Sequence, residues 1–332
     1  MHIVSLIGNL AGGAGRALVD ITRGFATDRQ TVLYGHPLGT FSFGLERELD
    51  AAGIPHGHVA DQAALEQALR ELAPDVVLFH WWQGVPLHKP AGRAAPWIMI
   101  NQNQQPMPQG YDFYVPTSKV NDLLQAHLPA ARRMMIYNGI DLARFPEWHK
   151  PAGDIFVIGR VSHLLPPKIS TEYLDFFAAL AIPRKRLLII GDGPMRPQLA
   201  ARAAALNLTG QVEFAGELRQ DELLPQLRRF DIACHLTDTH QEVFSLAMLE
   251  LLAMGIPVVT EPKGGLPEQI IHNGNGFISG HRHDHRRYCE LLARHPDLRA
   301  RLSQGARESV RPFTLERQHA AYREAIARCG TA

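Results

Sequence analysis

This 332-residue sequence has almost no net charge, few cysteines and no long apolar run. Lys and Arg number 34 and Asp and Glu number 33, so the formal net charge is only +1. A nearly neutral chain has no strong overall field that would draw it to nucleic acid or to an acidic membrane. An anionic ligand must therefore be held by a local cluster of cations.

The three cysteines, Cys234, Cys289 and Cys329, are too few for a disulfide framework and lack the spacing of a structural zinc site. No stretch approaches the roughly 20 apolar residues that a membrane-spanning helix needs. The apolar run at residues 3–7 is short for a secretory leader and predicts a first buried strand. We therefore expect a protein of the reducing cytoplasm.

Short apolar runs alternate with helical patterns, which predicts parallel sheets covered by helices on both faces. Predicted strands of the first half lie at residues 3–7, 31–34, 76–79, 97–100, 113–115 and 134–136. After a linker at residues 145–153, predicted strands follow at 155–158, 187–190, 212–214, 232–234 and 257–260. The length suits two α/β domains of roughly 150 residues each, which we place at residues 1–145 and 146–311.

Loops that follow strands are the candidate site, because ligands of parallel sheets gather at the carboxyl ends of the strands. In the first loop, residues 8–15, Gly12 and Gly13 would let backbone N–H groups approach an anion at a helix N-terminus. The loop matches neither G-x-G-x-x-G nor a P-loop, so a tight strand-to-helix turn is the alternative. No acidic residue ends the second strand, which argues against a nicotinamide-dependent dehydrogenase.

Two further loops follow strands of the second half. Arg160 directly follows Gly159, and Lys168 lies eight residues further on, so a guanidinium and an ammonium meet at one strand end. That pair suits a diphosphate, whereas two solvated cations are the alternative. Residues 191–194 form a Gly-Asp-Gly-Pro turn, in which Gly191 would permit close approach of a ligand.

The most informative segment, residues 242–250, reads EVFSLAMLE and leads into an apolar helix that Gly255 closes. If helical rise applies throughout, the carboxylates of Glu242 and Glu250 lie about 12 Å apart. That distance is too long for the acid and base pair of a glycoside hydrolase, which needs roughly 5 to 9.5 Å. It suits two ends of an extended ligand.

These residues resemble family 4 of the retaining glycosyltransferases, whose mark is two glutamates separated by seven residues, then an apolar helix and a Gly-x-Pro-Val strand. Further blocks match in the family's order: residues 137–141, Arg160 with Lys168, 191–194, 212–216, 264–268 and 273–277. The resemblance implies a GT-B fold of two facing, doubly wound Rossmann-like domains. It also implies a crossover helix at residues 312–332 that packs back on the first domain.

The resemblance also implies the roles of the matched residues. The catalytic positions would be His80, Arg160, Lys168 and Glu242. The donor-binding positions would be Gly12, Gly13, Gly191, Gly216, Glu217, Leu218, Phe244, Ser245, Leu246 and Glu250.

Within that set, Arg160 and Lys168 would hold the donor diphosphate and neutralise its growing charge. Glu250 would bind the nucleotide ribose and Glu242 the donor sugar. Backbone N–H groups around Phe244 and Ser245 would face the sugar and phosphate. His80 would face the anomeric carbon, and a structural histidine is the alternative.

The sequence departs from the family pattern at three places. Ile169 follows Lys168 where the family has glycine, Leu78 replaces the first histidine of a His-x-His strand ending, and Phe244-Ser245 replaces Gly-Phe-Gly. The amide-rich segment at residues 101–105 matches no family block. None of these changes removes a charge that the implied mechanism requires.

We therefore expect a retaining, metal-independent glycosyltransferase that takes a nucleotide diphosphate sugar and no separate cofactor. The acceptor would be a saccharide, a lipid-linked or a small molecule, in cell-surface polysaccharide or lipopolysaccharide biosynthesis. The alternatives are a sugar-nucleotide epimerase, a phosphorylase and a silent nucleotide-sugar-binding protein. Arg132 and Arg133 could contact the inner face of a membrane, or could simply form a solvated helix end.

Overall fold

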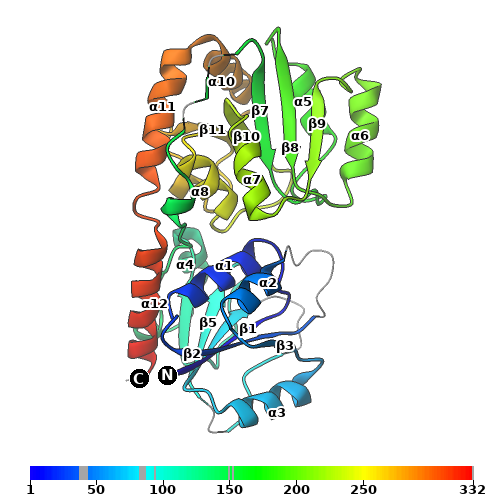
Figure 1. Cartoon of the computed structure of the whole chain (residues 1–332). Coiled ribbons are helices and arrows are strands. Elements are labelled where there is room, and N and C mark those ends of the chain that lie inside the picture. Colours follow the sequence, from blue (N-terminus) through cyan, green and yellow to red (C-terminus); the bar gives the residue numbers. More distant parts are fainter. Residues whose placement is uncertain (37–43, 82–86, 93–94, 149, 152, 331–332) are drawn as a thin grey trace. The chain divides into compact units, whose positions relative to one another are not determined.

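The computed structural model describes residues 1–36, 44–81, 87–92, 95–148, 150–151 and 153–330. The chain divides into two compact units, of which unit 1 comprises Met1–Ile140 with Phe313–Ala332 and unit 2 comprises Asp141–Pro312. The two sheets and their helices are labelled in Figure 1.

Unit 1 is built on a six-stranded parallel sheet in the order β3-β2-β1-β4-β5-β6. Its strands are β1 (His2–Ile7), β2 (Arg29–Tyr34), β3 (His56–His58), β4 (Val76–Trp81), β5 (Trp97–Asn101) and β6 (Phe113–Pro116). Its helices are α1 (Gly12–Arg23), α2 (Leu45–Ala51), α3 (Gln62–Leu72), α4 (Lys119–Leu124) and α12 (Leu315–Gly330), with a 3-10 turn at Ala130–Arg132. This strand order is that of a doubly wound dinucleotide-binding domain.

The two faces of the unit 1 sheet carry separate cores, as the alternation of side chains along a strand requires. Val77 and Phe79 of β4 pack in one core with Trp97 and Met99 of β5. Val76 and Leu78 pack in the other, together with α12.

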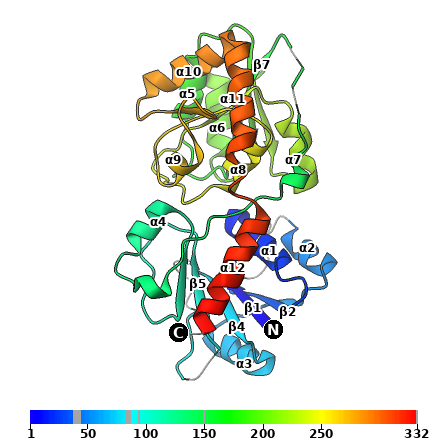
Figure 2. The ribbon, with the colours of Figure 1, turned by 90° about the vertical axis from the view of Figure 1, so that its left-hand side faces the viewer.

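The terminal helix α12 belongs to unit 1 although the chain reaches it from unit 2. Tyr322 is fully buried in the unit 1 core. The His319 ring contacts the Asp20 carbonyl oxygen at 2.8 Å, and a Cβ at Gly24 would lie 2.4 Å from that ring. Glycine at position 24 thus permits the close approach of α12 (red) to the end of α1 (Figure 2).

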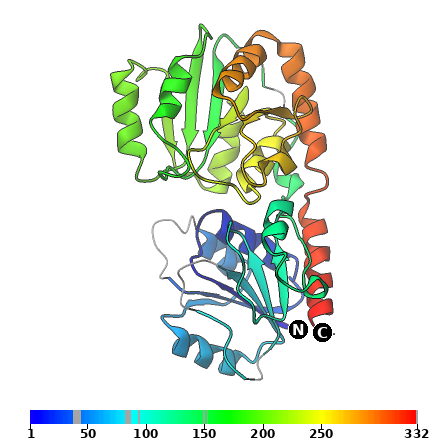
Figure 3. The same ribbon diagram turned by 180° about the vertical axis from the view of Figure 1, so that it is seen from behind.

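Unit 2 repeats the same topology, with a parallel sheet in the order β12-β11-β10-β7-β8-β9. Its strands are β7 (Phe156–Val161), β8 (Lys185–Ile190), β9 (Val212–Gly216), β10 (Ile232–His235), β11 (Val258–Thr260) and β12 (Gly276–Ile278). Its helices are α5 (Glu172–Ala178), α6 (Arg196–Ala205), α7 (Gln220–Leu227), α8 (Leu246–Ala253), α9 (Leu266–Gln269), α10 (Arg282–Arg294) and α11 (Pro296–Ser309), with a 3-10 turn at Leu142–Arg144. Helices cover both faces of this sheet (Figure 3).

The predicted strand at residues 134–136 was wrong. This segment runs beside β6, where the N–H groups of Met134 and Ile136 donate to the carbonyl oxygens of Tyr114 and Pro116. These two bonds do not form a strand ladder. The segment is joined to β6 by an isolated parallel bridge between Tyr114 and Arg133. The apolar run reflects burial of Ile136 in the core and not a seventh strand.

The segment at residues 145–153 that was predicted as a linker falls within unit 2. Trp148 donates from its indole nitrogen to the Arg228 carbonyl oxygen at 3.3 Å, and the Arg228 guanidinium lies 4.9 Å above its ring. Lys150 forms an ion pair with Asp231. Among the described residues, no helix is both long and apolar enough to cross a lipid bilayer.

Candidate active site

The carboxyl ends of β7, β8, β9 and β10 lie at one edge of the unit 2 sheet, because all its strands are parallel. The loops that leave this edge carry Lys168 after β7, Gly191 after β8 and Glu217 after β9. Glu242 lies in the segment between β10 and α8. The tertiary structure thus gathers the sequence-predicted residues of the second half at one edge.

Arg160 is the last but one residue of β7 and is only 1% exposed. Its guanidinium donates to the Leu236 carbonyl oxygen at 2.7 Å and to the Lys168 carbonyl oxygen at 2.6 Å. It also donates to Ser162 Oγ at 3.1 Å and lies 4.7 Å above the Tyr173 ring. In this structure Arg160 fixes the loop that carries Lys168, and direct contact with a diphosphate stays a prediction.

Lys168 and Glu242 form an ion pair, with Lys168 Nζ 3.1 Å from Glu242 Oε1. His235 Nε2 lies 3.5 Å from the same oxygen, and His240 Nε2 lies 3.5 Å from Oε2. We call Lys168, His235, His240 and Glu242 the Glu242 cluster. The two histidines were missed by sequence reasoning, although His235 directly follows the strand predicted at 232–234 and His240 lies two residues before the motif.

The cluster sets the charge of its carboxylate. Burial alone would raise the pKa of the Glu242 carboxyl group. The imidazoles of His235 and His240 and the Lys168 ammonium outweigh burial, so that its pKa lies well below the usual value. Burial lowers the pKa of His235, and the nearby Arg160 and Lys168 charges act in the same direction. Glu242 is therefore an ionised acceptor in a buried setting at neutral pH.

Helix α8 begins at Leu246, so the segment that joins Glu242 to it is not helical. The separation of about 12 Å, which assumed helical rise from residue 242, therefore lacks its basis. Glu250 is half-buried in the second turn of α8, and Leu246 is half-buried at its start.

The backbone around Ser245 differs from the expectation. The Ser245 N–H donates to Gln269 Oε1 at 3.0 Å, and Gln269 returns a bond from Nε2 to the Ser245 carbonyl oxygen at 2.8 Å. Ser245 caps α8 by accepting from the Met248 N–H at 3.4 Å. Because Gln269 occupies the Ser245 N–H, that group is not directed at a ligand here, and the neighbouring Phe244 is buried.

The glycines after β8 serve contact between loops. A Cβ at Gly191 would lie 2.1 Å from the Ser162 carbonyl oxygen, and one at Gly193 would lie 2.6 Å from that of Leu164. Both glycines have positive φ, of 122° and 153°. Glycine is required at both positions because the backbone packs closely on the loop after β7. The sequence alone did not reveal this contact.

Gly216 ends β9 with a positive φ of 74°. The next residue, Glu217, is half-buried, and burial together with the Asp192 charge raises its pKa to about 7. Leu218 is half-buried beside it. These three residues lie at the same sheet edge as the Glu242 cluster.

The predicted residues of unit 1 lie at the carboxyl edge of its own sheet. Gly12 begins α1 with φ 59°, and a Cβ at Gly13 would meet no atom within 4 Å. His80 lies in β4, is 2% exposed, and burial lowers its pKa to about 3. Neither ring nitrogen of His80 has a hydrogen-bond partner in the described part of the chain.

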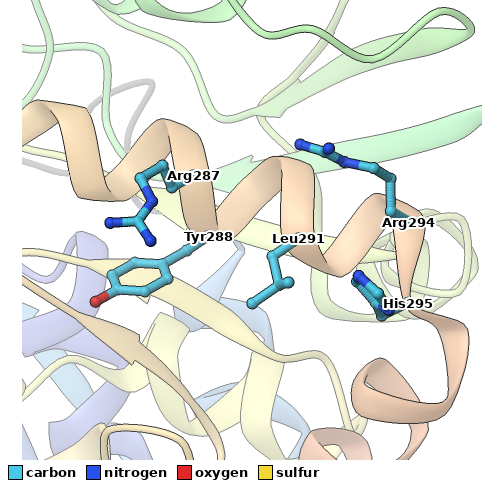
Figure 4. A pocket seen from close by; sticks show the side chains of 5 residues that line it. All are labelled: Arg287, Tyr288, Leu291, Arg294 and His295. Carbon is cyan, nitrogen blue, oxygen red and sulfur yellow. The ribbon is translucent and has the colours of Figure 1, made fainter.

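Arg133, one of the two arginines considered for membrane contact, is tied into unit 1. It forms an ion pair with Asp122 at 2.8 Å and donates to the Gln125 carbonyl oxygen. Across the described ranges, no three or more His, Cys, Asp and Glu side chains are grouped to hold a metal ion. A shallow pocket on α10 is lined by Arg287, Tyr288, Leu291, Arg294 and His295, and shares none of the predicted site residues (Figure 4).

The fold of the chain can be compared with those of solved structures. The two parallel six-stranded sheets match solved structures of the GT-B class. The structure of HepE from Anabaena in complex with UDP-glucose superposes with a TM-score of 0.82 and 18% identity, over 100% of both chains. A glycosyltransferase from Rickettsia africae superposes with a TM-score of 0.81 and 16% identity, over 99% of this chain and 98% of the other. At these identities the likeness establishes the fold alone.

The family model described as Glycosyl transferases group 1 matches residues 145–309. A D-inositol 3-phosphate glycosyltransferase from Saccharomonospora viridis is 30% identical over 57% of this chain and 49% of its own length. A glycogen synthase from Mycobacterium tuberculosis is 33% identical over 43% of this chain and 34% of its own length. The match thus spans about half or less of these relatives. Residues 145–309 are a group 1 glycosyltransferase domain, and the resemblance drawn from the motifs is confirmed.

Proposed function

We propose that this chain is a retaining, metal-independent glycosyltransferase that moves a sugar from a nucleotide diphosphate donor to an acceptor. The observation that carries the proposal is the ion pair between Lys168 and Glu242 at the carboxyl edge of the group 1 domain. It joins a cation suited to a diphosphate with an ionised acceptor suited to sugar hydroxyls.

Lys168 would bind the diphosphate directly. An ammonium has three N–H donors, and one of them points to Glu242, which leaves two for phosphate oxygens. Negative charge on the diphosphate grows as the sugar departs, so a fixed cation stabilises the transition state more than the ground state. Arg160 would act chiefly by holding the carbonyl oxygens of Lys168 and Leu236, which fixes the loop.

Glu242 would accept hydrogen bonds from hydroxyl groups of the donor sugar, and Glu250 from the ribose of the nucleotide. Because Lys168 neutralises part of the Glu242 charge, sugar and diphosphate would be held by one connected pair. HepE, which shares the fold, was solved with UDP-glucose, so UDP-sugars are the first donors to test.

We further propose that the protein works in the cytoplasm, at the inner face of the membrane, in cell-surface polysaccharide or lipopolysaccharide synthesis. The three cysteines are all buried and unpaired, which fits a reducing compartment. The acceptor could be a saccharide, a lipid-linked molecule or a small metabolite.

The decisive experiment has two stages. Thermal unfolding is first measured with UDP-, GDP-, ADP- and dTDP-sugars, since a ligand at about 100 times its Kd adds about 2.7 kcal/mol to stability. Release of nucleoside diphosphate and sugar transfer are then followed with the best donor, in the presence of EDTA. Transfer with retained anomeric configuration is expected. Epimerised donor without transfer would indicate a sugar-nucleotide epimerase instead. Binding without any turnover would indicate a silent nucleotide-sugar-binding protein.

A further inference from the structure

Residues 237–240 form a short segment, Thr-Asp-Thr-His, between β10 and the EVFSLAMLE motif, and they lie outside every sequence block that matches the family. We call them the His240 segment. The N–H groups of Thr239 and His240 both donate to the Pro167 carbonyl oxygen, at 3.1 and 2.8 Å. Pro167 directly precedes Lys168. The segment is therefore tied to the loop whose ammonium is proposed to bind the diphosphate.

A second loop, which follows β11, holds the other end of the His240 segment. The Thr237 N–H donates to Glu261 Oε2 at 3.0 Å. Lys263 Nζ donates to the carbonyl oxygens of Thr237 and Asp238, at 2.7 and 2.6 Å. Within the segment, Thr237 Oγ1 donates to the His240 carbonyl oxygen at 2.8 Å. These bonds give His240 one backbone position, and none of them uses its imidazole.

The imidazole of His240 faces a different oxygen of Glu242 from the one that pairs with Lys168. His240 Nε2 lies 3.5 Å from Oε2, whereas Lys168 Nζ lies 3.1 Å from Oε1. An ionised carboxylate only accepts hydrogen bonds, so the ring nitrogen that faces it carries a proton. The His240 side chain is 32% exposed, compared with 11% for Glu242 and 3% for His235. His240 thus lies on the solvent side of the Glu242 cluster.

Contacts on both oxygens matter because a glutamate carboxylate turns easily about its last side-chain bond. That torsion has a broad, roughly two-fold preference and no sharp rotamer. Lys168 and His235 contact Oε1, and His240 adds a contact on Oε2. Two held oxygens define the plane of the carboxylate. They therefore define the directions from which hydroxyl groups can donate to it.

We propose that His240 is a positioning residue, which fixes the plane of the Glu242 carboxylate for recognition of the donor sugar. The inference rests on the proposed function, in which Glu242 accepts hydrogen bonds from sugar hydroxyl groups. A misdirected carboxylate loses hydrogen-bond geometry with the sugar but leaves contacts with the nucleotide unchanged. The His240 segment, which the matched family blocks do not include, thereby takes part in the choice of sugar.

Two substitutions test whether Nε2 is the atom that matters. In His240→Gln the amide nitrogen can take the place of imidazole Nε2, whereas in His240→Asn it reaches only the place of Nδ1. Turnover is measured with UDP-glucose, GDP-mannose, ADP-glucose and dTDP-glucose. For the donor that the wild type uses, kcat/KM should fall about tenfold in His240→Asn, and His240→Gln should recover most of this loss. The affinity for the matching nucleoside diphosphate, measured by calorimetry, should be the same in all three proteins.

A matched control is His283→Asn, which removes a histidine whose side chain is 71% exposed on α10 and should turn over as the wild type does. A double-mutant cycle then shows whether His240 acts through the carboxylate. In the Glu242→Gln background, His240→Asn should change kcat/KM by no more than about twofold. Wild-type turnover by His240→Asn, equal losses in the two His240 variants, or the full loss in the Glu242→Gln background would each overturn the positioning role.

A measurement without nucleotide sugar separates this inference from the proposed function. The chain is labelled with carbon-13 at the glutamate carboxyl groups, and the NMR signal of Glu242 is the one missing from Glu242→Gln. The pKa of Glu242, which lies well below its usual value, should rise in His240→Asn. An unchanged pKa would overturn the contact on which the inference depends. A raised pKa without turnover of any nucleotide sugar would refute the proposed function and leave that contact standing.

Discussion

A buried, neutral His80 makes the stability of unit 1 depend on pH. Burial lowers the folded-state pKa of His80 to about 3, whereas an exposed histidine of the unfolded chain has a pKa near 6.5. The folded state then binds fewer protons than the unfolded state between these values. Stability from this residue is complete above about pH 6.5 and is lost as the pH falls toward 3.

The size of the loss follows from the linkage relation. At pH 5 the solution is about 1.5 units below the unfolded-state pKa, and each unit is worth about 1.36 kcal/mol. His80 should therefore cost about 2 kcal/mol of unfolding free energy at pH 5 relative to pH 7.5. Any folded-state pKa below about 4 gives the same result at this pH, so the prediction does not depend on its precise value.

Urea unfolding followed by tryptophan fluorescence measures this effect, because three of the four tryptophans lie in unit 1. We expect the stability difference between pH 7.5 and pH 5 to be about 2 kcal/mol smaller in His80→Leu than in the wild type. His58→Gln removes an exposed histidine of the same unit and serves as the control. If His80→Leu keeps the full acid sensitivity of the wild type, His80 is not a buried neutral residue and the reasoning fails.

Further predictions concern the donor site. Lys168→Ala should weaken donor binding at least tenfold, whereas Arg160→Ala should in addition lower the unfolding free energy by on the order of 3 kcal/mol, because two carbonyl oxygens lose their donor. Calorimetry with UDP-glucose measures the loss of binding, and urea unfolding measures the loss of stability. Equal stability of the two variants would contradict the role given to Arg160. Glu250→Gln should lower the affinity for free nucleoside diphosphate, whereas Glu242→Gln should spare that affinity and reduce kcat/KM for the intact donor; the opposite pattern in a binding assay would reverse the two roles. EDTA should leave turnover largely intact, and loss of activity that manganese restores would reveal a metal site.

Much of the fold could be predicted from local sequence because buried parallel strands have continuous apolar runs. The runs at residues 76–79, 97–100 and 187–190 all lie within strands. The short edge strands β3 and β12 were missed, since His56–His58 and Gly276–Ile278 have only three residues each. The run at residues 134–136 was misassigned, because burial in a core gives the same apolar signal as a strand.

The candidate site was also predicted only in part from the sequence. Spacing and the parallel topology were enough to bring Lys168 and Glu242 to one sheet edge, where they pair. Neither signal indicated that Arg160 would donate to the carbonyl oxygens of Leu236 and Lys168, or that Gln269 would occupy the Ser245 N–H. Those partners lie 24 or more residues apart, except for Lys168, and no local pattern encodes them.

The sequence by itself determined the α/β class, the two halves and the family motif, because apolar periodicity and turn residues act over short distances along the chain. Only the tertiary structure decided which groups surround Glu242 and which polar atoms remain without a partner. Hydrogen bonding and desolvation depend on neighbours in space, so the ionised state of Glu242, its contact with His240 and the neutral state of His80 appear only after the chain has folded.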